Sequence, residues 1–395
     1  MQNKRIFGNE LKYIKDVLNK EFRTSSNSFM VKKLEKSFEK KFNSNNAISF
    51  TNGTSTMHAC LEAAEIGIGD EVIVPPLTMS ATSIAVLNSN ATPVFADVNR
   101  DTFLIDFNDI EKKITKKTKA IITVSLFGLV PEMDEIIKIA KKNKLLLIED
   151  NAECFLGYYK GKLAGNFGDA ASYSFQSSKH ITCGEGGMLL VKNNKLAEKI
   201  RSIHSLGYKL SKNNSINKAK LLSPNYFRHY NLGWNYRMSD LCAAVAMGQL
   251  ENLDYFVKLR IKVANLYNDA SSSFSWFKKQ KIPSYCEHSY WSWVAYIDGK
   301  NINWSDFQKK FIYFGGSALY GSWKLTYKEP FFKKFRFNKR EKLISKINLR
   351  RLKKTNCPNA EYLQKRLFQF KTNFYSINEA KKEAYALNQT LKFFN

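Results

Sequence analysis

Cysteine is scarce in this sequence and never occurs in closely spaced pairs. The six cysteines are spread over 395 residues, with no CxxC pair and no histidine at finger-like spacing from them. A disulfide framework and a structural zinc site both need such pairs, so both are excluded. The sequence therefore predicts no metal site and a reducing compartment, which we take to be the cytoplasm.

Long apolar runs are also missing. No uninterrupted apolar stretch approaches the roughly 18 residues that a membrane-spanning helix requires, which excludes a helical membrane protein. The opening MQNKRIFGNE has no apolar segment of the secretory type, so we expect the chain to stay where it is made. With 44% hydrophobic residues the chain can still bury a sizeable core.

Acidic residues are few: 35 Asp and Glu face 62 Lys and Arg, for a net charge of +27. Residues 331–355 contain eleven basic side chains and only one acid, Glu341. Their interleaved phenylalanines allow a nucleic-acid surface, but no known nucleic-acid-binding motif accompanies them. We therefore favour a solvated basic face over an apolar core stripe and expect no nucleic-acid partner.

Between residues 46 and 205, short apolar runs alternate with segments of helical periodicity, which predicts an α/β fold with a mainly parallel central sheet flanked by helices. The expected strands are 47–50, 71–76, 93–98, 120–127, 144–150, 171–175 and 187–191. The expected crossover helices are 83–90, 109–117 and 132–143.

The chain is expected to divide near residue 250. We predict a large domain over 1–250 and a smaller α+β carboxy-terminal domain over 251–395, which begins with a long helix. The polar stretch 209–224 ends in proline and predicts an exposed loop.

Three segments place polar residues just after predicted strands, where ligands bind in open α/β sheets. The run TNGTST (51–56) precedes a helix and can bind an anion through backbone N–H groups, although it also fits an ordinary turn and helix cap. Asp150 ends an apolar strand and can hold a proton on a nitrogen heterocycle, although it also fits a solvated loop. Lys179 lies before the turn 184–187, where a confined lysine is a candidate Schiff-base former.

Taken together, these segments resemble the DegT/DnrJ/EryC1/StrS family of sugar aminotransferases, which have the fold type I architecture of pyridoxal-phosphate (PLP) enzymes. The resemblance rests on the ordered blocks TNGT, EDNAE, SFQSSKHITCGEGG and GWNYRMSD. It runs from about residue 30 to 250 and thins to fragments beyond.

The resemblance implies that Lys179 forms the Schiff base with PLP and that Asp150 pairs with the pyridinium nitrogen. It places the cofactor phosphate on a set of small polar residues from two parts of the chain. These are Gly53, Thr54, Ser55 and Ser174, joined by Asn235 from a neighbouring subunit, which implies a homodimer with shared sites.

Some positions depart from the family pattern. Met79 stands where an aromatic side chain commonly covers the cofactor ring, and a thioether is a weaker platform. Glu153 stands where a glutamine or histidine often meets the cofactor's phenolate oxygen. The way the protein adjusts the electronic properties of the cofactor is therefore expected to differ in this chain.

The implied function is transfer of an amino group from an amino acid, with L-glutamate favoured, to an anionic keto-sugar. We expect a nucleotide-linked 4-keto-6-deoxy sugar used for surface polysaccharide or glycoconjugate biosynthesis, with pyridoxamine phosphate as the intermediate cofactor form. One alternative is a keto-sugar dehydratase or deoxygenase of the same fold, in which histidine characteristically replaces the lysine. His180 follows Lys179 directly and calls for a check of the register. A second alternative is a non-catalytic basic binding protein.

Overall fold

The structure, a computed structural model, describes residues 6–20, 28–208 and 223–395. The loop predicted at 209–224 therefore lies, except for its last two residues, outside the described residues. Within the described ranges no helix is long and apolar enough to cross a membrane, and no cluster of three or more metal-ligating side chains occurs.

A seven-stranded sheet forms the centre of the molecule, in the order β1-β9-β8-β5-β4-β2-β3. Its strands are β1 (Ala47–Phe50), β2 (Glu71–Val74), β3 (Thr92–Phe95), β4 (Thr118–Val124), β5 (Leu146–Asp150), β8 (Ala170–Ser174) and β9 (Gly187–Val191). Only β9 runs opposite to the other six, since it is antiparallel to both of its neighbours. The predicted α/β fold with a mainly parallel sheet is thereby confirmed.

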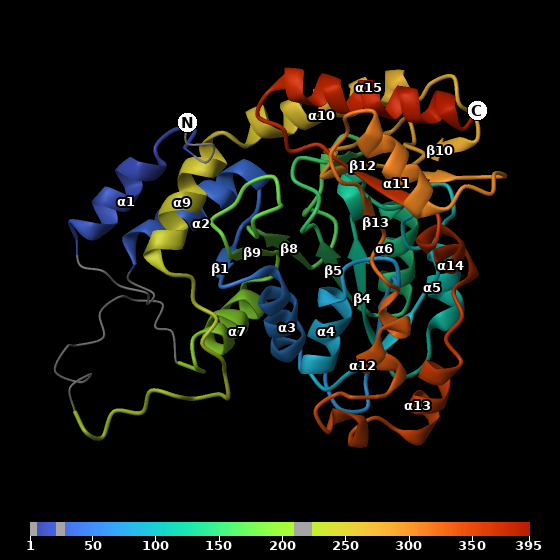
Figure 1. Cartoon of the computed structure of the whole chain (residues 1–395). Coiled ribbons are helices and arrows are strands. Elements are labelled where there is room, and N and C mark those ends of the chain that lie inside the picture. Colours follow the sequence, from blue (N-terminus) through green and yellow to red (C-terminus); the bar gives the residue numbers. More distant parts are fainter. Residues whose placement is uncertain (1–5, 21–27, 209–222) are drawn as a thin grey trace.

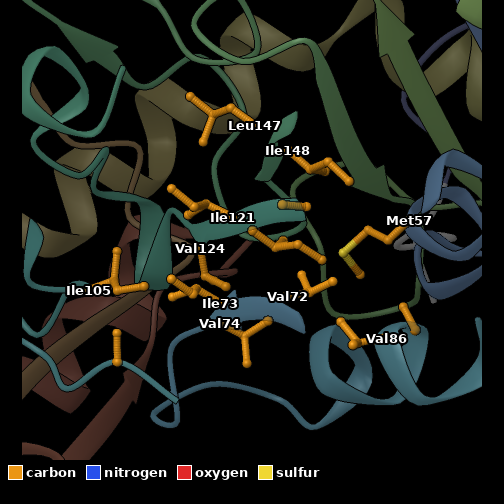
Figure 2. Close-up of a cluster of buried hydrophobic side chains, with 14 of the residues drawn as sticks. Met57, Val72, Ile73, Val74, Val86, Ile105, Ile121, Val124, Leu147 and Ile148 are labelled. Atoms are coloured by element: carbon orange, nitrogen blue, oxygen red, sulfur yellow. The ribbon is translucent and has the colours of Figure 1, made fainter. Parts of the chain in front are cut away.

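Helices cover both faces of this sheet (Figure 1). They are α1 (Glu10–Leu18), α2 (Phe29–Phe42), α3 (Gly53–Ala63), α4 (Ala81–Asn88), α5 (Phe107–Lys113), α6 (Met133–Lys142), α7 (Asn194–His204) and α9 (Asp240–Glu251). Successive strand residues point to opposite faces, so Leu189 packs in one apolar cluster and Leu190 in another. Figure 2 shows the first cluster, with Ile121 and Ile148 of the central strands near Met57 of α3.

The chain after α9 forms a second sheet with its own helices. A four-stranded antiparallel sheet has the order β10-β12-β14-β13. Its strands are β10 (Phe277–Lys279), β12 (Ser292–Ile297), β13 (Tyr320–Gly321) and β14 (Leu367–Lys371). The accompanying helices are α10 (Leu253–Ala270), α11 (Trp304–Tyr313), α12 (Pro330–Lys333), α13 (Lys346–Lys353), α14 (Pro358–Gln364) and α15 (Ile377–Phe393).

The predicted division after residue 250 falls within the last turn of α9, and later segments pack back against the part of the chain that precedes it. Strand β11 (Cys286–Glu287) pairs with β6 (Tyr158–Tyr159), which also pairs with β7 (Lys162–Leu163). The stretch 326–360 packs most of its apolar side chains into the core around the first sheet. The domain boundary therefore stays a prediction.

Candidate active site

A cavity of about 840 Å³ lies beyond the carboxyl ends of the parallel strands. Its wall combines residues that follow β1, β2, β5 and β8 with residues of β12, β13 and β14. Seven of the nine predicted site residues line it: Gly53, Thr54, Met79, Asp150, Glu153, Ser174 and Lys179. Segments more than 300 residues apart in sequence thus meet in one cavity.

Lys179 projects into this cavity from the turn after β8. Its side chain is 12% exposed, and its Nζ lies 3.2 Å from Glu153 Oε1 and 4.4 Å from the centroid of the Trp291 ring. Trp291 Nε1 donates to the carbonyl of Ser178 at 2.9 Å, and this hydrogen bond connects Trp291 to the turn that carries Lys179. The lysine is therefore confined on two sides.

His180 does not share this position. Its side chain is buried, and its Nε2 lies 2.9 Å from the carbonyl oxygen of Ser289, outside the cavity wall. Burial lowers the pKa of His180 well below its usual value, so the ring is neutral. In the register check raised by the sequence, this geometry favours Lys179, which lines the cavity, over His180, and the role of Lys179 stays a prediction.

Asp150 is the last residue of β5, and its carboxylate is buried in the cavity floor. It accepts hydrogen bonds from Thr82 Oγ1 at 2.8 Å and from the amide of Ala152 at 3.2 Å. Burial raises the pKa of Asp150, while these two donors and the charge of Lys179 oppose that rise. Such a carboxylate can partner a cationic nitrogen that enters the cavity.

Glu153 is the second buried acid. Its Oε1 accepts from Lys179, and its Oε2 accepts from the amide of Phe127 at 3.1 Å. Phe127 reaches this geometry at φ 64°, in the left-handed region that bulky residues seldom adopt. Burial raises the pKa of Glu153, and the neighbouring Lys179 lowers it by a smaller amount.

The amino-terminal end of α3 offers free hydrogen-bond donors. Asn52 caps the helix by accepting from the amide of Ser55 at 2.8 Å, and no described group accepts from the amides of Gly53 and Thr54. A Cβ built on Gly53 would lie 3.2 Å from Ser174 Cβ, so the Ser174 side chain adjoins this helix start. Unpaired amides at the positive end of an eleven-residue helix, beside a serine, fit a phosphate group.

The glycine turn after Lys179 brings β9 against this helix start. A Cβ on Gly187 would lie 2.6 Å from the carbonyl carbon of Asn52 and 2.8 Å from the amide nitrogen of Gly53. Real Cβ atoms do not approach backbone that closely. Glycine at position 187 therefore lets the strand support the donors at Gly53.

Two predicted site residues lie outside the cavity wall. Ser55 is buried, and its hydroxyl donates to the carbonyl of Asn52 at 2.8 Å. Asn235 is exposed and bridges to Ser205 in an isolated β-bridge. Their roles in cofactor binding stay predictions.

Sequence reasoning missed Arg260 of α10. Its buried guanidinium donates to the carbonyls of Lys179 at 3.1 Å and of Trp291 at 2.7 Å, and to Thr372 Oγ1 at 3.1 Å. The signal was an arginine on the helix face that also carries the buried Phe256, Val263 and Tyr267. Trp323, which stacks on Trp291 with centroids 5.8 Å apart, was missed because its neighbours form no regular pattern.

A largely buried lysine near two buried carboxylates, in one cavity with a helix start that can bind an anion, suits the class of PLP-dependent aminotransferases. A profile of the DegT/DnrJ/EryC1/StrS aminotransferase family matches residues 4–343. The chain belongs to this family, and its cofactor is PLP.

Individual relatives agree with this assignment. The GDP-perosamine synthase of Escherichia coli O157:H7 is 36% identical over 288 residues, which cover 72% of this chain and 74% of that protein. The aminotransferase from Psychrobacter cryohalolentis superposes with a TM-score of 0.81 at 26% identity, covering 98% of this chain and 97% of that one. Helicobacter pylori PseC, an aminotransferase of pseudoaminic acid biosynthesis, has a similar fold, with a TM-score of 0.83 at 21% identity over 98% of both chains. The predicted sugar aminotransferase function is confirmed, and the non-catalytic alternative is not supported.

Proposed function

We propose that the enzyme transfers an amino group from L-glutamate to a nucleotide-linked 4-keto-6-deoxy sugar, for surface polysaccharide or glycoconjugate biosynthesis. The observation that carries this proposal is the single cavity in which Lys179 and Asp150 face a wall from the second sheet. The name of the Escherichia coli relative supports a nucleotide-linked sugar product. The six free cysteines fit a reducing compartment, so we place the reaction in the cytoplasm.

We assign the cofactor contacts as follows. When bound, PLP supplies a reactive aldehyde and an electron-withdrawing ring. Asp150 holds the ring nitrogen in its charged form, and Met79, which is 53% exposed, offers its thioether to a ring face. The amides of Gly53 and Thr54 and the hydroxyl of Ser174 hold the phosphate, while Ser55 sets the helix start through Asn52.

Lys179 has two tasks in this assignment. With PLP bound, its amine would hold the cofactor aldehyde covalently, with loss of water, and as the free amine it would move the proton at the substrate α-carbon. Glu153 holds the freed amine at 3.2 Å. Because burial raises its pKa, Glu153 takes up a proton readily and can donate a hydrogen bond to the phenolic oxygen.

The wall from the second sheet suits a sugar nucleotide. Trp291 and Trp323 both line the cavity and lie nearly parallel, with an interplanar angle of 20°, and they offer apolar ring surface to a pyranose ring or a base. The exposed Lys371 of β14 stands at the cavity edge and supplies positive charge for a diphosphate.

We further propose a homodimer in which Asn235 completes the phosphate site of the partner. Asn235 is exposed and outside the cavity of its own chain. Within eight residues before it in sequence stand large exposed apolar side chains, Phe227 at 77%, Tyr230 at 56% and Leu232 at 83%. Such a patch commonly marks a protein interface.

The substrate proposal is tested with the pyridoxamine form of the full-length enzyme. Nucleotide-linked 4-keto sugars should restore the visible absorbance of the lysine-bound cofactor, while the same sugars without the nucleotide should do so much more slowly. Return of the absorbance with α-keto acids only would contradict a sugar acceptor.

The shared site is tested by mixing two inactive variants, Lys179→Ala and Asn235→Asp. Random exchange makes about half of the dimers mixed, each with one intact site, so up to roughly a quarter of wild-type activity should return. No return of activity, although mass spectrometry detects mixed dimers, would place each site within one chain.

A further inference from the structure

Residues 331–355, here called the basic strap, concentrate charge far more than the rest of the chain. The strap holds eleven basic residues and one acid, a net +10 of the chain's +27. It includes most of α12 and all of α13, which Figure 1 shows at the end of the molecule away from α10 and α15. Neither the reaction nor the cofactor assignment uses it.

The inner side of the basic strap is apolar. Phe332, Phe337 and Ile344 are buried in the core around the seven-stranded sheet. Phe332 packs against Phe95 of the edge strand β3, with ring centroids 5.3 Å apart. Phe332 and Phe337 therefore cover the sheet edge, while Phe331 and Phe335 pack against the same core and stay only partly exposed.

The outer side of the basic strap carries positive charges that no described acidic side chain neutralises. Nine of the eleven basic side chains are exposed: Lys333, Lys334, Arg336, Lys339, Lys342, Lys346, Arg350, Lys353 and Lys354. None of these nine forms an ion pair with a described residue, whereas Arg351 turns inward to Glu71 at 2.6 Å. On α13 the exposed Lys346, Arg350 and Lys353 recur at helical spacing and form one face.

Two aliphatic side chains stand exposed among these charges. Leu343 is 42% exposed and Ile347 is 65% exposed. Both lie next to exposed lysines, Lys342 and Lys346. An exposed face that combines Lys and Arg with isolated aliphatic residues is typical of surfaces that lie on a membrane.

The α13 part of the basic strap, which carries Lys346, Arg350 and Lys353, lies at the opposite end of the parallel strands from the active site. Arg351 pairs with Glu71 and Asn348 Nδ2 donates to Thr92 Oγ1 at 3.4 Å, and these partners are the first residues of β2 and β3. The active site lies beyond the last residues of the strands. A partner on the strap would therefore leave the cavity open.

We propose that the basic strap is a peripheral binding surface for an anionic phospholipid bilayer. Its lysines and arginines contact the acidic headgroups, and Leu343 and Ile347 lie at headgroup depth. Single-stranded nucleic acid fits less well, because such binding uses exposed aromatic rings for base stacking, and the four rings of the strap are buried or only partly exposed. A second copy of this chain is disfavoured by repulsion between two faces of like charge.

The test is co-sedimentation of the PLP-loaded full-length enzyme with vesicles. We expect binding to phosphatidylcholine vesicles that contain phosphatidylglycerol, little binding to phosphatidylcholine alone, and release by salt.

Two variants test whether the strap is the binding surface. A strap variant loses four positive charges from the strap, and a control variant loses four positive charges from the opposite end of the molecule. The strap variant carries Lys339→Gln, Lys342→Gln, Lys346→Gln and Arg350→Gln. The control carries Lys278→Gln, Lys309→Gln, Lys381→Gln and Lys382→Gln, all at exposed positions.

Each cation near an anionic surface contributes about a fivefold change in partitioning, so the strap variant should bind several-hundredfold more weakly and the control much less so. Leu343→Gln with Ile347→Gln should weaken binding at fixed charge, compared with Ile68→Gln and Ile312→Gln at other exposed sites. Aminotransferase rates without vesicles should be unchanged in the strap and control variants, which shows that both fold.

Three results would overturn the proposal. One is the absence of binding to anionic vesicles. Another is an equal loss of binding in the strap and control variants, which would show that binding depends on the net charge of the protein and not on the strap. The third is strap-dependent binding of single-stranded RNA that anionic vesicles do not compete away.

Discussion

Replacing Asp150 by asparagine tests two effects of the buried carboxylate separately: its effect on the stability of the folded chain and its effect on the catalytic rate. The two side chains have the same shape, and the surrounding hydrogen bonds can be kept. The asparagine Oδ1 accepts from the amide of Ala152, and its Nδ2 donates to the Thr82 hydroxyl, which rotates to accept. We therefore expect Asp150→Asn to fold and to bind PLP.

The catalytic effect should be large. A neutral amide cannot stabilise a positive charge on the cofactor ring nitrogen, so the loss should be on the order of 100-fold or more in the half-reaction with L-glutamate. Single-turnover stopped-flow spectroscopy measures this step directly. A rate close to wild type would show that the ring nitrogen meets another group and that Asp150 has no electrostatic role.

The stability of the enzyme without cofactor should change in the opposite sense. Burial raises the pKa of Asp150, so the folded chain takes up this proton at a higher pH than the unfolded chain does. The stability linked to Asp150 is thus fully present below the unfolded pKa of about 3.9 and is lost as pH rises from there through the raised pKa of the folded chain. At neutral pH the asparagine variant should be more stable than wild type, by about 1 kcal/mol, as is common when a functional group is removed from an active site.

Thermal unfolding of the cofactor-free proteins at several pH values measures this effect. The gain should shrink toward acid pH, where Asp150 is itself protonated. A cofactor-free variant that is less stable than wild type at neutral pH would refute the burial argument, because the attraction to Lys179 would then outweigh desolvation.

Three further substitutions test other parts of the site. Lys179→Ala should fold and bind PLP without a covalent link, so that borohydride no longer traps the cofactor; turnover within about tenfold of wild type would contradict its role. Gly187→Ala should weaken PLP binding more than it weakens binding of pyridoxal without phosphate, because the new Cβ displaces Asn52 and Gly53; equal losses would disprove the phosphate site. Arg260→Met should lower kcat by about tenfold to 100-fold with a smaller change in KM and in PLP affinity, because the backbone of Lys179 loses its anchor. Arg260→Lys is the matched control, and a rate like wild type in both variants would exclude a positioning role.

Much of the fold could be predicted from the sequence, because local apolar patterns carry that information. Each of the seven predicted strand segments overlaps an observed strand, and 47–50 and 187–191 agree at both ends. The long helix expected near residue 251 is α10. The prediction did not show that β9 runs against its neighbours, because strand direction depends on how long connections cross the sheet.

The active-site residues also fall into two groups, those that the sequence could predict and those that only the structure showed. The motifs around Asp150 and Lys179 could be found by sequence because each pairs an apolar strand with a polar end. Arg260 and Trp323 could not, because their roles arise from contacts across more than 30 residues with groups that no local pattern marks.

The basic segment shows the division most clearly. Its composition fixed an excess of positive charge, and the sequence left open whether the interleaved phenylalanines face solvent. Tertiary packing decided this, because the exposed edge of β3 needs apolar cover and Phe332 and Phe337 supply it. The hydrophobic effect turned the rings inward, and the lysines and arginines between them were left to face water because burying an unpaired charge costs too much.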